Sequence, residues 1–414
     1  MKKIAAIILI TAAVMTLTSV TARLEKAQLT LSWCCGQEAR RTILEETIAD
    51  YMATHPDVQI DVINPAGYST VMKTWVVSGN APDIMWYGVN WPALMDFVMP
   101  VDEMLAKTRL DQSIHPGLLK LLQWEGRTWG VPYGAGAHVM YYNKDLFDRA
   151  GLHYPGADWT WDEAISMARK LTVDSDGDGQ PDQWGLNLDA EYQIHGLLYG
   201  GDFYASDKRQ ARFDNPVTAK AVQLYAEMKA GIERVWGGKF ADGNVAMASD
   251  GAFTLEVARK YLFDWDLTNL PQLIVDDKSY RSNFMGPESW LISKTAKHPA
   301  IALEIVALLL SEEVMGKWGR SGTSIPSQPR IALKHFVSTA TRGENMAAFV
   351  QALDYGYVQH QTHPIGLEIQ GWMYAQQPWK DMWAAQTPAS NALPELEKGV
   401  NVMLDEYWSR KGAK

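Results

Sequence analysis

Three apolar segments near the start of the chain alternate with two helical patterns, and this order limits the folds that the chain can adopt. Apolar and polar residues alternate over 29–33 and over 58–62, and residues 84–87 form a short apolar run. Between these segments, apolar residues recur at helical spacing over 39–52 and 68–77. A strand–helix–strand–helix–strand order predicts an α/β domain with a largely parallel sheet.

In such a sheet, ligands bind beyond the carboxyl ends of the strands. The first strand leads at this edge into Trp33 and the adjacent Cys34 and Cys35, and the third leads into the aromatic segment 86–91. Neighbouring cysteines can form only a strained disulfide, so we interpret them as two reduced, buried thiols and leave their pairing open.

The N-terminus has the pattern of an export signal. Lys2 and Lys3 precede an uncharged apolar run over 4–20, and small residues follow up to Ala22. This pattern predicts a signal peptide over 1–22, cleaved near Ala22, and a periplasmic protein. The alternative is an uncleaved anchor, although the run is slightly shorter than the roughly 20 residues that a spanning helix needs.

The composition argues against several classes of partner. The net charge is −10, and no basic stripe is present, which disfavours nucleic acid and anionic lipid surfaces. The chain contains 17 Trp and 17 Tyr. Aromatic faces cover the C–H patches of sugar rings, while amide and carboxylate groups bond the hydroxyls. We therefore expect a small, uncharged, sugar-like ligand.

Several motifs occur in a fixed order along the chain. They are SGNAPDI at 78–84, GRTWGVPY at 126–133, YYNKDLF at 141–147, WTWDE at 159–163, DNP at 214–216, VAMASDG at 245–251, GPESWLIS at 286–293 and GTSIP at 322–326. Within them, Thr160 and Glu163 form a capping-box pattern, and Asn215 followed by Pro216 predicts a helix start.

In this order the motifs resemble the family 1 extracellular solute-binding proteins of ATP-driven importers, to which the maltose-binding proteins belong. The resemblance implies a periplasmic-binding-protein-like α/β fold, with two lobes of parallel-rich sheet joined by a hinge of several strands. It places one lobe at 28–138 plus 289–333 and the other at 139–288 plus 334–414. It also implies a monomer that captures a sugar or oligosaccharide between the lobes and delivers it to membrane permease subunits.

The resemblance carries a set of ligand-binding positions onto this chain. They are Trp33, Cys35, Tyr87, Asn90, Trp91, His138, Glu191, Tyr192, Phe253, Met285, Gly286 and Trp372. The two thiols in the first loop and Phe253, where relatives often have Trp, depart from the family pattern.

One acidic loop has the spacing of a calcium site. Oxygen-bearing side chains occupy alternate positions at Asp174, Asp176, Asp178, Gln180 and Asp182. This spacing predicts a structural calcium site, but the last position of the motif is a glycine in place of the bidentate acid. The alternative is a tight turn that binds no metal. No other cofactor is expected.

Two alternative functions remain open from the sequence. A secreted glycosidase would also be acidic and rich in tryptophan, and it needs two carboxylates facing a sugar bond. No familiar hydrolase or phosphate-loop motif is present. A binding protein for a polyol, polyamine or peptide would keep the same lobes. We therefore predict a binding protein and not an enzyme.

Overall fold

The computed structural model describes residues 26–34, 38–188, 192–231, 234–357 and 359–412. The predicted signal peptide at 1–22 lies outside this part of the chain. Within the described residues, no helix combines the length and the apolar content needed to cross a bilayer.

Most of the strands belong to one mixed sheet. The exceptions are two hairpins, in which β4 pairs with β5 and β10 pairs with β11. All the strands described are β1 (Ala27–Ser32), β2 (Val58–Ile63), β3 (Ile84–Tyr87), β4 (Gln123–Trp124), β5 (Arg127–Thr128), β6 (Val131–Asn143), β7 (Trp184–Asn187), β8 (Val245–Gly251), β9 (Trp265–Thr268), β10 (Leu273–Val275), β11 (Lys278–Tyr280), β12 (Met285–Ile292) and β13 (Ile325–Pro326).

Helices surround this sheet. The α-helices are α1 (Glu38–Thr54), α2 (Tyr68–Val77), α3 (Asp102–Thr108), α4 (Leu110–Ser113), α5 (Pro116–Leu121), α6 (Lys144–Arg149), α7 (Trp161–Leu171), α8 (Tyr192–Leu198), α9 (Pro216–Lys229), α10 (Leu255–Ala258), α11 (Pro299–Leu309), α12 (Glu312–Ser321), α13 (Pro329–Ile331), α14 (Ala347–Gln351), α15 (Gly366–Ala375), α16 (Gln377–Trp383) and α17 (Ala389–Gly412). Shorter helical turns include η1 (Trp91–Phe97), η3 (Ala252–Thr254) and η7 (His360–Thr362).

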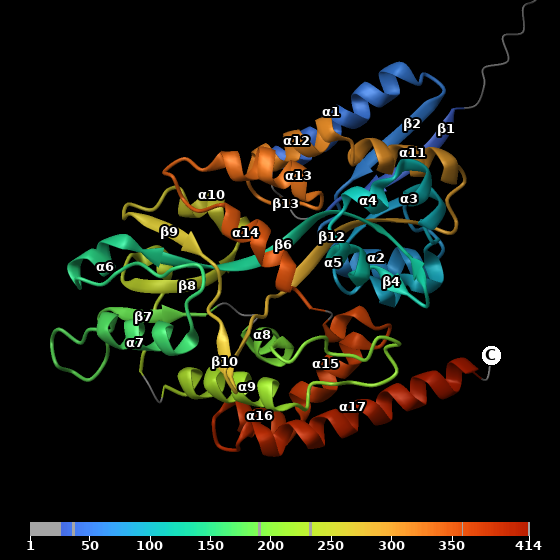
Figure 1. The fold of residues 1–414 in the computed structure, drawn as a ribbon. Helices are drawn as coiled ribbons and strands as arrows, with labels where there is room; N and C mark the ends of the chain where they lie inside the picture. The colour runs from blue at the N-terminus through green and yellow to red at the C-terminus, as the bar shows by residue number, and fades with distance from the viewer. Residues whose placement is uncertain (1–25, 35–37, 189–191, 232–233, 358, 413–414) are drawn as a thin grey trace, which may run out of the picture.

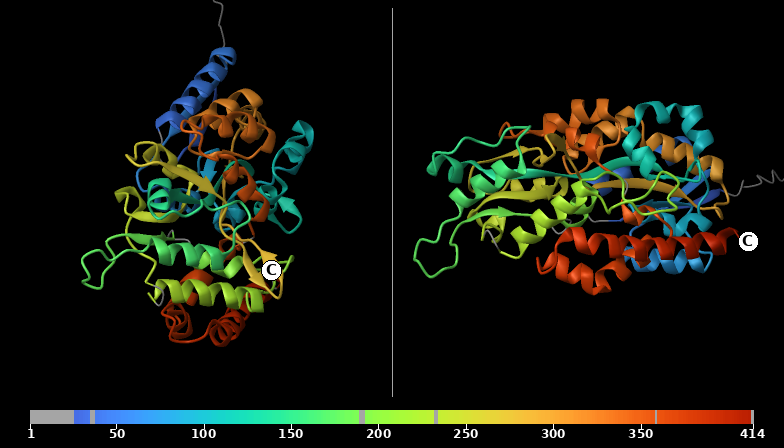
Figure 2. Two further views of the ribbon diagram at one scale, coloured as in Figure 1. Left: turned by 60° about the vertical axis from the view of Figure 1, so that its left-hand side comes forward. Right: turned by 60° about the horizontal axis from the view of Figure 1, so that its bottom comes forward.

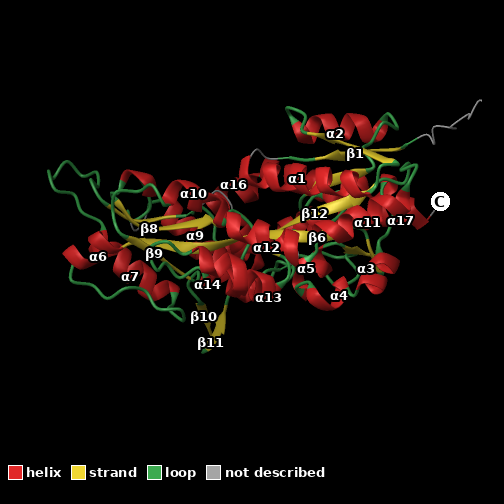
Figure 3. Ribbon diagram, turned by 90° about the horizontal axis from the view of Figure 1, so that it is seen from above, coloured by secondary structure: helices red, strands yellow, loops and turns green. Residues whose placement is uncertain are grey.

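The strand order of the sheet is β2-β1-β3-β12-β6-β8-β7, and β13 and β9 also pair with β6. The predicted parallel pairing is confirmed for β1 with β2 and β3, and parallel pairing also joins β7 to β8. The central strands differ, because β12 is antiparallel to both β3 and β6, and β6 is antiparallel to β8. Seen from above, the strands form a layer through the length of the molecule with helices on both sides (Figure 3).

Strand alternation divides the apolar side chains of the first lobe between two cores. Ile84 and Trp290 pack in the larger core, which also contains apolar residues of α1, α11 and α12. Tyr87 and Leu291 pack in a second core with apolar residues of α2 and η1. Successive residues of a strand point to opposite faces, and burying both faces requires helices above and below the sheet.

The long strand β6 joins two α/β lobes. Its first half pairs with β12, up to the pair Ala137 and Met285, and its second half pairs with β8 from His138 onward. The second lobe therefore continues the sheet of the first through one uninterrupted strand (Figure 1). The exact lobe boundaries stay predictions.

Local helix signals behave as the sequence indicates. Thr160 and Glu163 form the predicted capping box at the start of α7, and Asn215 caps α9, whose first residue is Pro216. These contacts satisfy backbone N–H groups that the first helical turn leaves unpaired.

The last helix connects the two lobes on one side. The first part of α17 packs along α9 and α16 of the second lobe, and the helix then continues beneath the first lobe (Figures 1 and 2). Tyr407 and Trp408 near its end pack against the second core of the first lobe.

Candidate functional site

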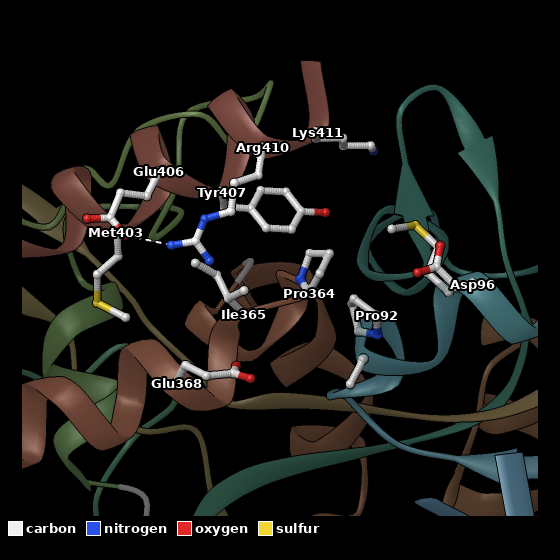
Figure 4. A pocket seen from close by; sticks show the side chains of 12 residues that line it. Pro92, Asp96, Pro364, Ile365, Glu368, Met403, Glu406, Tyr407, Arg410 and Lys411 are labelled. Carbon is white, nitrogen blue, oxygen red and sulfur yellow. Dashed lines mark hydrogen bonds and ion pairs between the residues drawn. The ribbon is translucent and has the colours of Figure 1, made fainter. Parts of the chain in front are cut away.

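A groove of about 720 Å³ lies between η1 of the first lobe and helices α15 and α17 (Figure 4). This volume falls within the range of roughly 300 to 1,000 Å³ that is usual for small-molecule sites. Its lining residues are Pro92, Ala93, Met95, Asp96, Pro364, Ile365, Glu368, Met403, Glu406, Tyr407, Arg410 and Lys411.

Each wall of the groove contributes a carboxylate. Asp96 lies on η1, Glu368 on α15 and Glu406 on α17. The two cations of the groove are both paired, because Arg410 Nη2 lies 3.1 Å from Glu406 Oε2 and Lys411 Nζ lies 2.6 Å from Glu125 Oε1. The groove therefore offers hydrogen-bonding groups of both kinds without an excess of positive charge.

Tyr407 is the aromatic side chain of the groove wall. It is half-buried, and its ring lies 4.9 Å from the His363 ring in an edge-on arrangement. Burial raises the pKa of Tyr407 to about 12, and the nearby carboxylates of Glu125 and Asp96 add to the effect. The hydroxyl therefore remains protonated at neutral pH and can donate a hydrogen bond to a ligand oxygen.

A second cluster lies beside β6 and β12, which are called the crossing strands because they run across the junction between the lobes. The backbone N–H of His138 donates to Asn283 Oδ1 at 2.9 Å, and its Nδ1 lies 3.2 Å from His195 Nε2. The His138 ring also lies near Phe253 and Phe284, at 6.3 and 5.5 Å between ring centroids. Phe253 is 56% exposed, so it presents an apolar face to solvent beside the hinge.

An ion pair links α1 to the crossing strand β12. Arg40 Nη1 lies 3.0 and 2.9 Å from the two carboxylate oxygens of Glu288, and Ser324 Oγ donates to Glu288 at 2.6 Å. The Arg40 side chain is almost fully buried. This contact fixes the start of α1, which follows the loop of the predicted ligand positions Trp33 and Cys35.

Three predicted ligand residues are buried in the first lobe. Trp33 is 1% exposed and packs against Tyr133, Trp290 and Trp318. Tyr87 is 3% exposed in the second core, and Trp91 is fully buried and donates from Nε1 to the Leu121 carbonyl. In this structure these rings pack inside the two cores and expose no face to a ligand, so their role in binding stays a prediction.

The other predicted positions are divided among several places. Asn90 is half-buried at the start of η1. Met285 and Gly286 lie on β12, beside Ala137 and Gly136 of β6. Trp372 packs against Gly399 of α17. Cys35 and Glu191 lie outside the described residues, as does the side chain of Tyr192, whose backbone begins α8. Cys34 is disulfide-bonded, which differs from the interpretation of two reduced thiols.

The structure brings His138, Phe253, Met285 and Gly286 to the crossing strands. The groove wall includes none of the described residues that the sequence singled out. The signal for the groove residues was the helical repeat of Met403, Tyr407 and Arg410 in the C-terminal stretch, the part that matched the family pattern least.

The acidic loop forms a compact turn. Carboxylate oxygens of Asp174, Asp176 and Asp182 lie within 4.8 Å of one another. Asp174 accepts hydrogen bonds from the amides of Gly177 and Gly179, both of which have positive φ. Glycine adopts such angles without strain, so the backbone can fold the three carboxylates together.

Another predicted calcium ligand, Asp178, behaves differently. The Asp178 carboxylate accepts a hydrogen bond from the Gln180 amide at 2.7 Å, and Asp178 is not among the three converging acids. The three that converge have the oxygen chemistry that calcium prefers. Calcium binding itself stays a prediction.

Comparison with known proteins identifies relatives of the whole fold. The protein is 19% identical to a cyclic α-maltosyl-1,6-maltose-binding protein from Arthrobacter globiformis, with a TM-score of 0.77 over 92% of this chain and 100% of that one. A sugar-binding protein from Xanthomonas citri gives a TM-score of 0.75 at 16% identity, over 94% and 100% of the two chains. These likenesses establish the periplasmic-binding-protein fold.

The relatives found by sequence are also solute-binding proteins. A lactose-binding protein from Rhizobium radiobacter is 23% identical over 68% of this chain and 70% of its own length. A glycerol-3-phosphate-binding periplasmic protein from Yersinia pestis is 24% identical over the same shares. A maltotriose-binding protein from Pyrococcus abyssi is 21% identical over 60% of this chain and 54% of its own length.

The family profile described as bacterial extracellular solute-binding protein matches residues 36–316, which is more than half of the chain. The match begins just before α1 and ends in α12, so it includes β6 and β12 and every strand of the main sheet except β1 and β13. The chain therefore belongs to the bacterial extracellular solute-binding proteins.

Proposed function

We propose that this protein is the carbohydrate-binding subunit of an ATP-driven importer and that it holds a sugar or short oligosaccharide between its lobes. The observation that carries the proposal is the groove between η1, α15 and α17, which takes hydrogen-bonding groups from both lobes. Because a ligand there touches both walls, it favours the arrangement in which the walls are close. The membrane permease would recognise that arrangement.

The chemistry of the groove supports a neutral polyhydroxylated ligand. Asp96, Glu368 and Glu406 can accept from sugar hydroxyls, and Tyr407 adds a ring and a donor. A phosphate ligand is less well served, because Arg410 is engaged by Glu406. Relatives named for lactose and maltotriose point to the same class of ligand.

A ligand screen tests this function. Thermal shift followed by calorimetry would compare mono-, di- and oligosaccharides with glycerol 3-phosphate, polyols, polyamines and peptides. A ligand at a hundredfold excess over its dissociation constant raises stability by about 2.7 kcal/mol. We expect a saccharide to bind and to be recovered intact. Binding of glycerol 3-phosphate or a polyamine alone, or cleavage of the saccharide, would contradict the proposal.

We also propose that the acidic loop binds calcium as a structural ion. The convergence of Asp174, Asp176 and Asp182 supports the proposal, and the ion would steady an exposed loop of the second lobe. The loop would have no part in ligand capture.

A further inference from the structure

The end of α17 is held by a contact with a hairpin of the first lobe. The hairpin consists of β4 and β5, and its Trp124 is 2% exposed within the second core. The rings of Trp124 and Trp408 stack with centroids 5.6 Å apart and planes 4° from parallel. Offset stacking at this separation is a favourable arrangement for aromatic pairs.

Cations surround the stacked pair. Lys411 Nζ lies 5.2 Å from the Trp408 ring and 5.6 Å from the Trp124 ring, while it pairs with Glu125 of the hairpin. The guanidinium of Arg209 lies 4.4 Å from the Trp408 ring. Ammonium and guanidinium groups are attracted to aromatic faces, so these contacts hold the helix end from several directions.

A buried lysine connects the hairpin with the segment that leads into the groove wall at Pro364. Lys208 Nζ donates to the Gln123 carbonyl at 3.2 Å and to the Thr362 carbonyl at 3.0 Å, and it lies 5.3 Å from the Trp124 ring. Thr362 is two residues before Pro364 of the groove wall. The same hairpin therefore contacts two segments that line the groove.

Helix geometry couples this contact to the groove. Leu396, Val400 and Leu404 are buried at spacings of four residues, and Trp408 continues the same row. Residues three and four apart share one face of a helix. The groove-facing row of Met403, Glu406, Tyr407 and Arg410 lies beside it, so the packing of Trp408 fixes which way that row points (Figure 4).

We propose that Trp408 is a positioning residue of the ligand groove. By stacking on Trp124 of the opposite lobe, it orders the last turns of α17 and aims Tyr407 towards η1 (Figure 4). The ligand then meets a wall that is already formed, which lowers the entropic cost of binding. The effect on ligand affinity rests on the proposed function, whereas the ordering of the helix does not.

The first test needs no ligand. Hydrogen exchange would be measured for the amides of residues 403–410 in the wild type and in Trp408→Ala, Trp408→Phe and Trp236→Ala. Trp236 is a matched control, because it is also half-buried and lies 4.7 Å from the ammonium of Lys229, but it forms a bridge with Leu186 of β7 and is not part of this contact. We expect faster exchange in Trp408→Ala only, with Phe restoring slow exchange. Unchanged exchange in Trp408→Ala overturns the proposal.

The second test measures affinity for the saccharide that the screen identifies. Coupling between a distant contact and a binding site typically changes the ligand affinity by about 5- to 150-fold. We therefore expect Trp408→Ala to weaken binding by roughly tenfold. Trp408→Phe and Trp236→Ala should bind like the wild type. Faster exchange with unchanged affinity would show a docked helix end without a role in the groove and would overturn the proposal. If no saccharide binds the wild type, the proposed function fails, while the exchange data still decide whether Trp408 orders the wall.

Discussion

Arg40 Nη1 donates to both carboxylate oxygens of Glu288, at 3.0 and 2.9 Å, and so ties the first helix to a crossing strand 248 residues away in the sequence. Burial lowers the pKa of the Arg40 guanidinium, but the carboxylate of Glu288 and the Tyr133 hydroxyl raise it by more. The cation is thus kept charged in a site that water hardly reaches.

Removing the carboxylate should leave that cation buried without its partner. We expect Glu288→Ala to lower the free energy of unfolding by about 3 kcal/mol, at the lower end for broken buried pairs because Glu288 is partly exposed. Urea denaturation measures the change. Glu45→Ala is the control, because it breaks an exposed pair with Arg41 that water screens, so its effect on stability should be small. Equal effects of the two variants would contradict this account.

Two helical glycines should respond in opposite directions to alanine. A Cβ on Gly399 of α17 would lie 2.0 Å from the Trp372 ring, whereas a Cβ on Gly371 of α15 meets nothing within 4 Å. We expect Gly399→Ala to destabilise the fold by about 1 to 3 kcal/mol through overpacking. Gly371→Ala should stabilise it by up to about 1 kcal/mol, because alanine loses less backbone entropy in a helix. Thermal unfolding of both variants decides whether α15 and α17 pack as described.

Two buried histidines should make the fold sensitive to acid. Burial lowers the pKa of His360 to about 4, and burial together with Lys208 and Lys411 lowers that of His363 to about 3. In the unfolded chain both pKa values lie near 6.5. Below that pH the unfolded chain binds more protons than the folded one, so stability falls as the pH drops from about 6.5 towards 4.

The variant His363→Gln removes one of the two histidines and so measures its share of the pH dependence of stability. We expect its stability to fall less steeply than that of the wild type between pH 6.5 and 4.5, by about 1.4 kcal/mol per pH unit. Urea denaturation at a series of pH values gives the two curves. Parallel curves would show that folding does not lower the pKa of His363 and would contradict this account.

Calcium should stabilise the fold through three acids of the loop. We expect a higher melting temperature with calcium than with EDTA, and a loss of that difference in Asp174→Asn, because the ion binds only where the carboxylates converge. Asp178→Asn is the matched control, because its carboxylate lies outside the converging group. A melting temperature that is independent of calcium would mean that the loop is only a turn.

The groove should lose affinity when one acceptor is removed. With the saccharide found in the screen, we expect Glu368→Ala to weaken binding about tenfold, as the loss of one charged hydrogen bond would produce. Glu395→Ala removes an equivalent exposed carboxylate from α17 away from the groove and should bind normally. Isothermal titration calorimetry measures both. Equal affinities would place the ligand elsewhere between the lobes.

Much of the fold could be predicted from local patterns. Strand alternation and helical spacing located β1 to β3 with α1 and α2, and the capping residues Thr160 and Asn215 located two later helix starts. Such signals are local, so a single sequence carries them. Membership of a family of binding proteins also agrees with the prediction that the chain is not an enzyme.

The groove was harder to predict because it depends on contacts between distant segments. The aromatic segment at the end of β3 has the composition of a sugar platform, yet Tyr87 and Trp91 are used to fill a core. Nothing local distinguishes a Trp that packs from a Trp that binds. The wall on α17 was missed for the same reason, because its partner η1 lies about 310 residues earlier in the chain.

The uninterrupted strand β6 has a consequence for how such a protein can be rebuilt. Because β6 carries the pairing of both lobes and β12 returns across the same junction, each lobe is assembled from separate stretches of the chain. A chimaera with a relative cannot exchange one lobe at a single splice point. It must be cut in both strands with the register kept, so that recombination in this architecture favours exchange of loops and terminal helices over exchange of lobes.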